Sequence, residues 1–257
     1  MSFDTISLKN NPECPFGDLH WTGYYWKRTL IEPEYEEDYW GTVEDPDGVK
    51  RNFSDEWERR VEDKQNVYDF LNQVSPGKIL DVGCGPGIFL SGLNQVWECY
   101  GNDISKMALD HCAKYGKTIH GELPKLELNP DIYDVVSMQH VIEHLPNPIE
   151  YIDKIKFLLK DRGLFIIATP DFDSACARRF KNEFRMLHDK GHISLFTTYS
   201  LIKLLEDKEF EIIKIDYPFF KTRWFTKENL LRMFDTTKVS PPFYGSHVVI
   251  FCRNIKQ

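Results

Sequence analysis

From Ser75 onward the chain alternates short apolar segments with amphipathic ones, and this alternation constrains its fold more than any other feature. Short apolar runs between helical patterns indicate parallel strands, because each parallel connection needs a crossover helix. The expected strands are KILDV, ECYGND, KTIHG, YDVVSM, GLFIIAT, EIIKID and HVVIFCR. Helices are expected over 147–160 and near 198–207. The pattern therefore predicts an α/β protein with a doubly wound sheet of about seven strands.

The first 53 residues differ from the rest, because they are rich in aromatic, acidic and turn-forming residues without a sustained period. We expect an N-terminal arm or cap over 1–53 and one domain over 54–257, a length that one core can serve. Residues 218–242 form an insertion before the last strand. A helix is expected after Ser54, with a buried stripe of Val61, Val67, Phe70, Leu71 and Val74.

Composition and charge exclude several classes of function. With 32 basic and 40 acidic side chains, the chain has no basic face suited to a phosphate backbone, so no nucleic-acid partner is expected. Six cysteines without a Cys-x-x-Cys pair indicate neither a zinc knuckle nor a disulfide framework. Without a leader pattern or an apolar run of about 18 residues, we expect a cytoplasmic protein and no membrane insertion. The oligomeric state is left open.

The first strand ends in a turn with glycines at positions 83, 85 and 87, within KILDVGCGPG. Glycine is needed where the backbone turns sharply and a ligand approaches it closely. A dinucleotide-binding fold would place its third glycine at position 88, but that residue is Ile88. A nicotinamide-dependent oxidoreductase is therefore only an alternative.

An acidic residue at a strand end followed by this glycine spacing resembles the first motif of the class I S-adenosylmethionine-dependent methyltransferases, including their ubiquinone-type group. Asp81 through Gly87 matches that motif, and the likeness extends over roughly 75–215. The resemblance implies a Rossmann-like sheet of seven strands whose last strand is antiparallel. It also implies S-adenosylmethionine as the cofactor and S-adenosylhomocysteine as the product.

The resemblance further implies which residues contact the cofactor. Asp103 ends the second strand, and its carboxylate can accept two hydrogen bonds from ribose hydroxyls. Glu122 is expected near the adenine amino group, and Gln139 near the methionine portion. Arg28, with Tyr24 and Tyr25, is expected to fold back over the cofactor. The complete expected set is Asp81, Gly83, Cys84, Gly85, Gly87, Asp103, Ile104, Glu122, Leu123, Gln139 and Arg28.

Histidines follow the fourth strand in the string QHVIEHLPNP. His140 and His144 are four residues apart, so on a helical turn their imidazoles share a face. His192 follows Gly191, which lets it approach closely. We expect these histidines and Glu143 to border the acceptor, with His140, His192 or His144 as the catalytic base, since imidazole titrates near neutral pH.

A similar Glu-His signature with a downstream histidine occurs in metal-assisted O-methyltransferases of quinone biosynthesis and of small RNA ends. Those sites commonly carry a glutamate where this chain has His140. Our expectation is therefore that no metal is bound and that the signature is a packing and turn element. A divalent ion held by His140, Glu143, His144 and His192 is the alternative.

The predicted reaction is an in-line transfer of the methyl group to an oxygen of a small-molecule acceptor, such as a sugar, a quinone or another metabolite. Such a reaction depends on orientation and acceptor deprotonation, without a covalent enzyme intermediate. The aromatic segments YPFFKTRWF and GYYWKR suit a planar or sugar ring, or pack as a lid. A non-catalytic module that only binds S-adenosylmethionine is a further alternative, and acceptor identity is left open.

Overall fold

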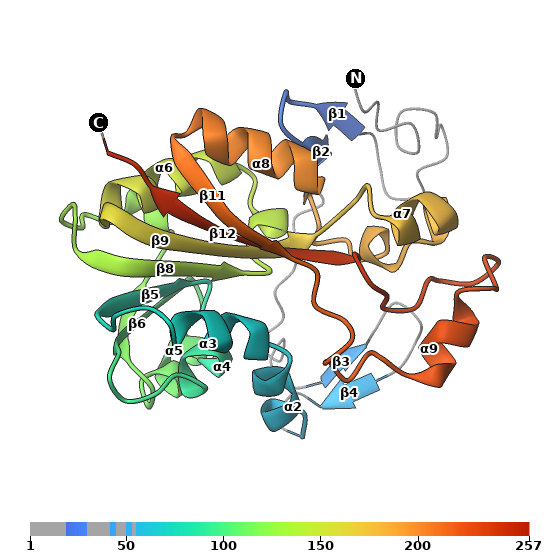
Figure 1. Cartoon of the computed structure of the whole chain (residues 1–257), viewed down its shortest axis with the longest axis horizontal. Helices are drawn as coiled ribbons and strands as arrows, with labels where there is room; N and C mark the ends of the chain where they lie inside the picture. The colour runs from blue at the N-terminus through green and yellow to red at the C-terminus, as the bar shows by residue number, and fades with distance from the viewer. Residues whose placement is uncertain (1–18, 30–41, 45–49, 53–54, 257) are drawn as a thin grey trace.

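The computed structural model describes residues 19–29, 42–44, 50–52 and 55–256. Its centre is a seven-stranded sheet with the order β11-β12-β9-β8-β5-β6-β7 (Figure 1). The strands are β5 (Lys78–Val82), β6 (Glu98–Asp103), β7 (Lys117–His120), β8 (Tyr133–Gln139), β9 (Leu159–Pro170), β11 (Phe210–Asp216) and β12 (His247–Asn254). All seven expected strands are present.

The sheet has the predicted doubly wound topology. Strands β5, β6, β7, β8 and β9 pair in parallel, while β12 is antiparallel to both β9 and β11. The expected antiparallel last strand is therefore confirmed. The chain order reverses at β5, with β6 on one side and β8 on the other, and α/β sheets bind ligands at the carboxyl ends of strands at such a point.

Different helices cover the two faces of the sheet (Figure 1). The helices are α2 (Trp57–Glu62), α3 (Gln65–Leu71), α4 (Ile88–Ser91), α5 (Lys106–Cys112), α6 (Pro148–Leu158), α7 (Ala175–Phe180), α8 (Thr198–Asp207) and α9 (Lys227–Arg232). On one face, Leu80 and Val136 pack with Ile155 of α6 in one core cluster. On the other, Ile79 packs with Leu71 of α3 in a second cluster. Each fully buried side chain of this size contributes about 1.5–3 kcal/mol.

The helix expected after Ser54 is instead two short helices, α2 and α3, and Ser54 itself lies outside the described residues. Val67 and Leu71 are buried on α3, whereas Val61 on α2 is only half-buried. Val61 and Val67 are six positions apart, which places them on different faces of one continuous helix. A break between them allows both side chains to face the same core cluster.

A second, three-stranded sheet joins the N-terminal hairpin to the middle of the chain. It consists of β1 (Leu19–Trp21), β2 (Trp26–Arg28) and β10 (Ser194–Leu195), in that order. A separate hairpin pairs β3 (Thr42–Glu44) with β4 (Lys50–Asn52). The remainder of the predicted arm lies outside the described residues, so the division at residue 53 stays a prediction. The described part of the chain contains no helix long and apolar enough to cross a membrane.

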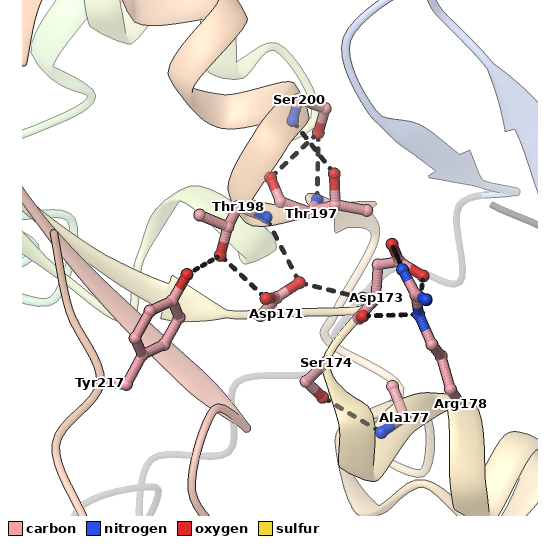
Figure 2. Close-up of polar contacts among 9 residues, drawn as sticks. All are labelled: Asp171, Asp173, Ser174, Ala177, Arg178, Thr197, Thr198, Ser200 and Tyr217. Atoms are coloured by element: carbon pink, nitrogen blue, oxygen red, sulfur yellow. Dashed lines mark hydrogen bonds and ion pairs between the residues drawn. The ribbon is translucent and has the colours of Figure 1, made fainter. Parts of the chain in front are cut away.

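A buried carboxylate fixes the segments that follow β9 (Figure 2). Oδ1 of Asp171 accepts hydrogen bonds from the amides of Asp173 at 2.9 Å and Thr198 at 3.3 Å. Its Oδ2 accepts one from Oγ1 of Thr198 at 2.8 Å, and the Tyr217 hydroxyl lies 3.5 Å from the same Oγ1. Thr197 caps α8 beside them. The end of β9, the start of α8 and the end of β11 are thereby held together.

Candidate functional site

The glycine turn after β5 is bound directly to the end of β6. Gly83 has a φ of 68°, and a Cβ at this position would lie 2.3 Å from Cγ2 of Val141. Glycine is therefore required both by conformation and by the close approach. The amide of Gly83 donates to the carbonyl of Asn102 at 2.7 Å. The amide of Gly85 donates to Oδ2 of Asp103 at 2.9 Å.

Asp103 is half-buried at the carboxyl end of β6, and its other oxygen, Oδ1, accepts from the amide of Ser105 at 2.8 Å. The next residue, Ile104, leaves 54% of its surface exposed. The sequence-predicted residues Gly83, Gly85 and Asp103 thus form one hydrogen-bonded unit, next to an uncovered apolar side chain.

Asp81 is almost completely buried at 3% exposure, and its Oδ1 has no hydrogen-bond partner among the described residues. Burial raises the pKa of this carboxyl to about 7, against the opposing effects of the Lys64 charge and a hydrogen bond with Ser137. Burial in turn lowers the pKa of Lys64. Sequence reasoning missed Lys64, because nothing in the sequence links a single cation between two short helices to an acid at the end of β5.

The other predicted cofactor residues are placed as follows. Cys84 and Leu123 are buried in the two core clusters, so any contact of theirs with a ligand would come from the backbone. The Glu122 side chain pairs with Lys125, whose Nζ donates at 2.7 Å. Nε2 of Gln139 donates to Oγ of Ser137 at 3.2 Å.

Glu143 lies in a short 3₁₀ helix over Ile142–His144. It is close to His140, His144 and His192, and these four residues form the histidine cluster. Only 1% of Glu143 is exposed. Its Oε2 accepts from Oγ1 of Thr169 at 3.0 Å, whereas its buried Oε1 has no hydrogen bond within the described ranges and lies 3.4 Å from Nδ1 of His140. Burial raises the pKa of Glu143, but the approach of His140, together with the nearby His144 and His192, outweighs it and gives a pKa of about 2.

His144 and His192 face each other, with ring centroids 4.8 Å apart. Nδ1 of His144 lies 3.0 Å from the carbonyl of Gly191, and Nδ1 of His192 lies 2.7 Å from the carbonyl of Met186. A carbonyl only accepts, so each Nδ1 carries a proton. Nε2 of His192 lies 3.5 Å from Oδ2 of Asp189. Burial lowers the pKa of His192, which favours its neutral form.

These three residues are brought together as metal ligands would be, since one donor atom each from Glu143, His144 and His192 lies within 4.8 Å of the others. Two imidazoles and one carboxylate are a ligand set that suits a divalent transition metal. The orphaned buried oxygen of Glu143 and the carbonyls that fix both tautomers also fit such an ion. His140 is 42% exposed by side chain and stands beside this group rather than within it.

His247 is a further site residue, and sequence reasoning missed it. It begins β12 directly opposite Pro170, the last residue of β9. Its ring packs edge-on against His140, with centroids 4.8 Å apart. Burial lowers its pKa well below the usual range. A signal was available in the predicted topology. A last strand that runs antiparallel begins where its parallel neighbour ends, so His247 was bound to lie at the same sheet edge as the histidines after β8.

The residues expected to fold back over the cofactor, Arg28, Tyr24 and Tyr25, contact other parts of the protein. Arg28 is completely buried and donates to the carbonyls of Leu187 and Asp189. The Tyr24 hydroxyl donates to Asp207, and Tyr25 packs on Phe196 of the core. These contacts are all made within the protein, and the covering of the cofactor by these three residues stays a prediction.

The insertion over 218–242 contains α9 and contributes Phe220 and Phe225 to an aromatic cluster with Tyr217 and Tyr244, which flank it. Phe220 packs against Phe225 and Tyr244, with centroids 5.3 Å apart in both pairs. Tyr217, which follows β11, packs against Tyr244 at 5.8 Å. Phe220, Phe225 and Tyr244 each leave more than 40% of their surface exposed. Tyr244 is three positions before His247, so this aromatic cluster is close in sequence to the start of β12.

Comparisons with known proteins agree with this geometry. A family model described as a methyltransferase domain matches residues 56–215. The ubiquinone biosynthesis O-methyltransferase of Haemophilus ducreyi is 32% identical over 105 residues, which cover 36% of this chain and 44% of that protein. The enzyme of the same name from Photobacterium profundum is 32% identical over 112 residues, covering 40% and 48%. The chain thus spans less than half the length of these two relatives.

A longer match is to an uncharacterised protein of Methanocaldococcus jannaschii, 25% identical over 225 residues that cover 85% of this chain and 87% of that one. Among solved structures, the plantazolicin methyltransferase BpumL in complex with SAH has a TM-score of 0.53 and 20% identity over 78% of this chain and 85% of its own. The [4+2]-cyclase SpnF has a TM-score of 0.56 and 14% identity over 75% and 81%. At these identities the likeness concerns the fold alone, and one fold serves different reactions.

Proposed function

This chain belongs to the methyltransferase domain family and is a class I S-adenosylmethionine-dependent enzyme, and from that premise we propose that it methylates an oxygen of a small-molecule acceptor. Because the chain belongs to this family, the nicotinamide-dependent oxidoreductase is no longer an alternative. The acceptor hydroxyl is placed at Glu143, His144 and His192. A single observation carries this placement: a buried carboxylate converges with two imidazoles whose Nδ1 atoms are bound to backbone carbonyls.

The cofactor is assigned to the carboxyl ends of β5 and β6. Asp103 has an ordered carboxylate on the glycine turn, which supports its contact with ribose hydroxyls. The exposed Ile104 supports packing against adenine, with Glu122 near the adenine amino group. Asp81 has a buried oxygen that lacks a partner among the described residues, which supports a contact with the ammonium group of the methionine portion.

Glu143, His144 and His192 are assigned to a divalent ion, in place of the metal-free site that the sequence favoured. Bound there, the ion would supply Lewis acidity that lowers the pKa of the acceptor hydroxyl. The protein contributes the geometry: Thr169 orients the carboxylate, and the carbonyls of Gly191 and Met186 fix the imidazoles.

A metal-free variant of the same reaction has its own supporting observation. His140 keeps 42% of its side chain exposed while its Nδ1 lies 3.4 Å from the carboxylate of Glu143. A carboxylate at this nitrogen orients the ring and leaves Nε2 free to accept a proton from the acceptor. In that case His140, rather than a bound ion, removes the proton.

The domain division belongs to the same proposal. Residues 54–257 carry the cofactor and the histidine cluster, while the arm over 1–53 and the insertion over 218–242 shape the acceptor side. Two observations support it. Strand β2 of the arm pairs with β10, two residues beyond His192, and Phe220 of the insertion packs against Tyr244, three positions before His247.

The test is S-adenosylhomocysteine formation with a panel of hydroxylated aromatic and sugar acceptors, before and after chelation. We expect chelation to abolish turnover and Mg²⁺ or Mn²⁺ to restore it, and Glu143→Gln to lose turnover while the exposed control Glu150→Gln does not. If the metal-free variant holds, chelation has no effect and His140→Ala loses about 10² to 10⁴ in rate. Methylation of amine acceptors only would contradict both variants.

A further inference from the structure

Arg28 is the last residue of β2 and one of the largest side chains that are fully buried, at 0% exposure. An arginine keeps its charge when buried, so its donors must be satisfied inside the protein. Nη1 donates to the carbonyl of Asp189 at 3.0 Å, and Nη2 donates to the carbonyl of Leu187 at 3.1 Å. One guanidinium thus holds two carbonyls of the segment over 186–193, which we call the His192 loop.

That loop carries and orients His192. The amide of His192 donates to the carbonyl of Asp189 at 3.3 Å, an oxygen that Arg28 also holds. Nδ1 of His192 donates to the carbonyl of Met186 at 2.7 Å, one residue before the second clamped carbonyl at Leu187. Both hydrogen bonds that fix His192 therefore end within the loop that the guanidinium clamps.

The backbone of Arg28 holds the residue on the other side of the histidine. Its amide donates to the carbonyl of Ile193 at 2.8 Å, and its neighbour Lys27 lies opposite Ser194 in the β2–β10 pair. Ile193 in turn donates its amide to the carbonyl of Glu143 at 2.8 Å. The hairpin, the His192 loop and the Glu143 segment are therefore one continuous hydrogen-bonded unit.

We propose that Arg28 is a positioning residue of the acceptor site, which holds the His192 imidazole at the separation from Glu143 and His144 that joint chelation requires. The role of His192 as a metal ligand rests on the proposed function, whereas the hydrogen bonds by which Arg28 holds the loop do not depend on it. A forked guanidinium is needed because its two nitrogens reach two carbonyls at once. A lysine at this position offers one donor centre and can hold only one of them well.

Two measurements on the full chain, saturated with S-adenosylhomocysteine, test this inference in Arg28→Lys and Arg28→Met. Hydrogen exchange should accelerate about tenfold at the amides of His192 and Ile193, because the loop loses its clamp. Mn²⁺ affinity should fall about 10- to 100-fold, as expected when an orienting partner of a ligand is lost. Affinity for S-adenosylhomocysteine should stay unchanged in both variants. Arg178→Met, which removes an exposed pair with Asp173, is the control and should match the parent protein.

The outcomes separate the two proposals. A parent protein that binds no Mn²⁺ would contradict the metal assignment, while the exchange rates would still decide whether Arg28 clamps the loop. Parental exchange at His192 and Ile193 in both variants would overturn the inference. Loss of S-adenosylhomocysteine binding in both variants would overturn it too, because Arg28 would then support the whole fold rather than His192.

Discussion

At the residue scale, the most perturbed acid of the cofactor side is Asp81, whose buried carboxyl has a pKa of about 7. This pKa lies above that of the unfolded chain, so the carboxyl destabilises the unliganded fold progressively as the pH rises from about 4 to about 7. Contact with a cationic ammonium group requires the ionised form instead. Cofactor binding should therefore be coupled to loss of a proton from Asp81.

We expect affinity for S-adenosylhomocysteine to weaken as the pH falls below about 7, by up to about tenfold per pH unit. Calorimetry between about pH 5 and 8 measures this directly. Asp81→Asn cannot ionise, so it should bind more weakly at pH 8 and show a much flatter profile. An unchanged slope in that variant would assign the dependence to another group.

Gly191 permits the close approach of His144 to the loop that carries His192. A Cβ at this position would lie 2.9 Å from Nδ1 of His144 and 3.1 Å from Oδ1 of Asp189. In Gly191→Ala the imidazole must move away from the carbonyl that fixes its tautomer, so Mn²⁺ affinity should fall about 10- to 100-fold. Lys190→Ala, a neighbouring exposed residue, is the matched control. Equal affinity in the two variants would argue against His144 as a ligand.

The sequence predicted which residues of the histidine cluster meet, because His140, Glu143 and His144 are close in the chain and His192 follows a glycine. Their roles stay predictions. Lys64 and His247 could not be found in the same way. Each meets its partner, Asp81 or His140, through tertiary packing, and neither has a local motif.

At the scale of elements, β5, β8, β9 and β12 were predictable because each contains an apolar run that is buried on both faces. Strands β6, β7 and β11 are more exposed, and the alternation of short apolar segments with helices predicted them. Strand β9 is longer than expected, since it begins at Leu159, directly after α6, and Leu159 already pairs with Tyr133. The β1–β2 hairpin was not predicted. Its strands have three residues each and β10 has two, too few for an alternating pattern to be visible.

The Asp171 carboxylate joins three elements and should matter for stability. It is 7% exposed and accepts two backbone amides and one hydroxyl. Asp171→Ala leaves these donors without their acceptor, so the free energy of unfolding should fall by about 2–4 kcal/mol. Urea unfolding measures this change, with Asp110→Ala, an exposed acid paired with Lys106, as the control. A loss no larger than that of the control would show that water replaces the carboxylate.

At the scale of the whole molecule, one edge of the sheet collects the turn after β5, Asp103 at the end of β6, His140 and His144 after β8, and His247 at the start of β12. The enzyme class and the cofactor were predictable because Asp81 and the glycines at 83, 85 and 87 form a local motif. That motif lies within a recognisable alternation of strands and helices. The acceptor was not predictable, because the elements nearest the histidines, the β1–β2 hairpin and β10, come from distant parts of the chain and pair only in the folded protein.

The proposed function depends on a divalent ion that Glu143, His144 and His192 would hold beside the cofactor. Titration of the full chain with Mn²⁺, followed by electron paramagnetic resonance in the presence of S-adenosylhomocysteine, tests it without knowledge of the acceptor. We expect one bound Mn²⁺ per chain, and its loss in Glu143→Gln and His192→Ala while both variants keep their affinity for S-adenosylhomocysteine. No bound Mn²⁺ in the parent protein, or Mn²⁺ bound equally well by both variants, would contradict it.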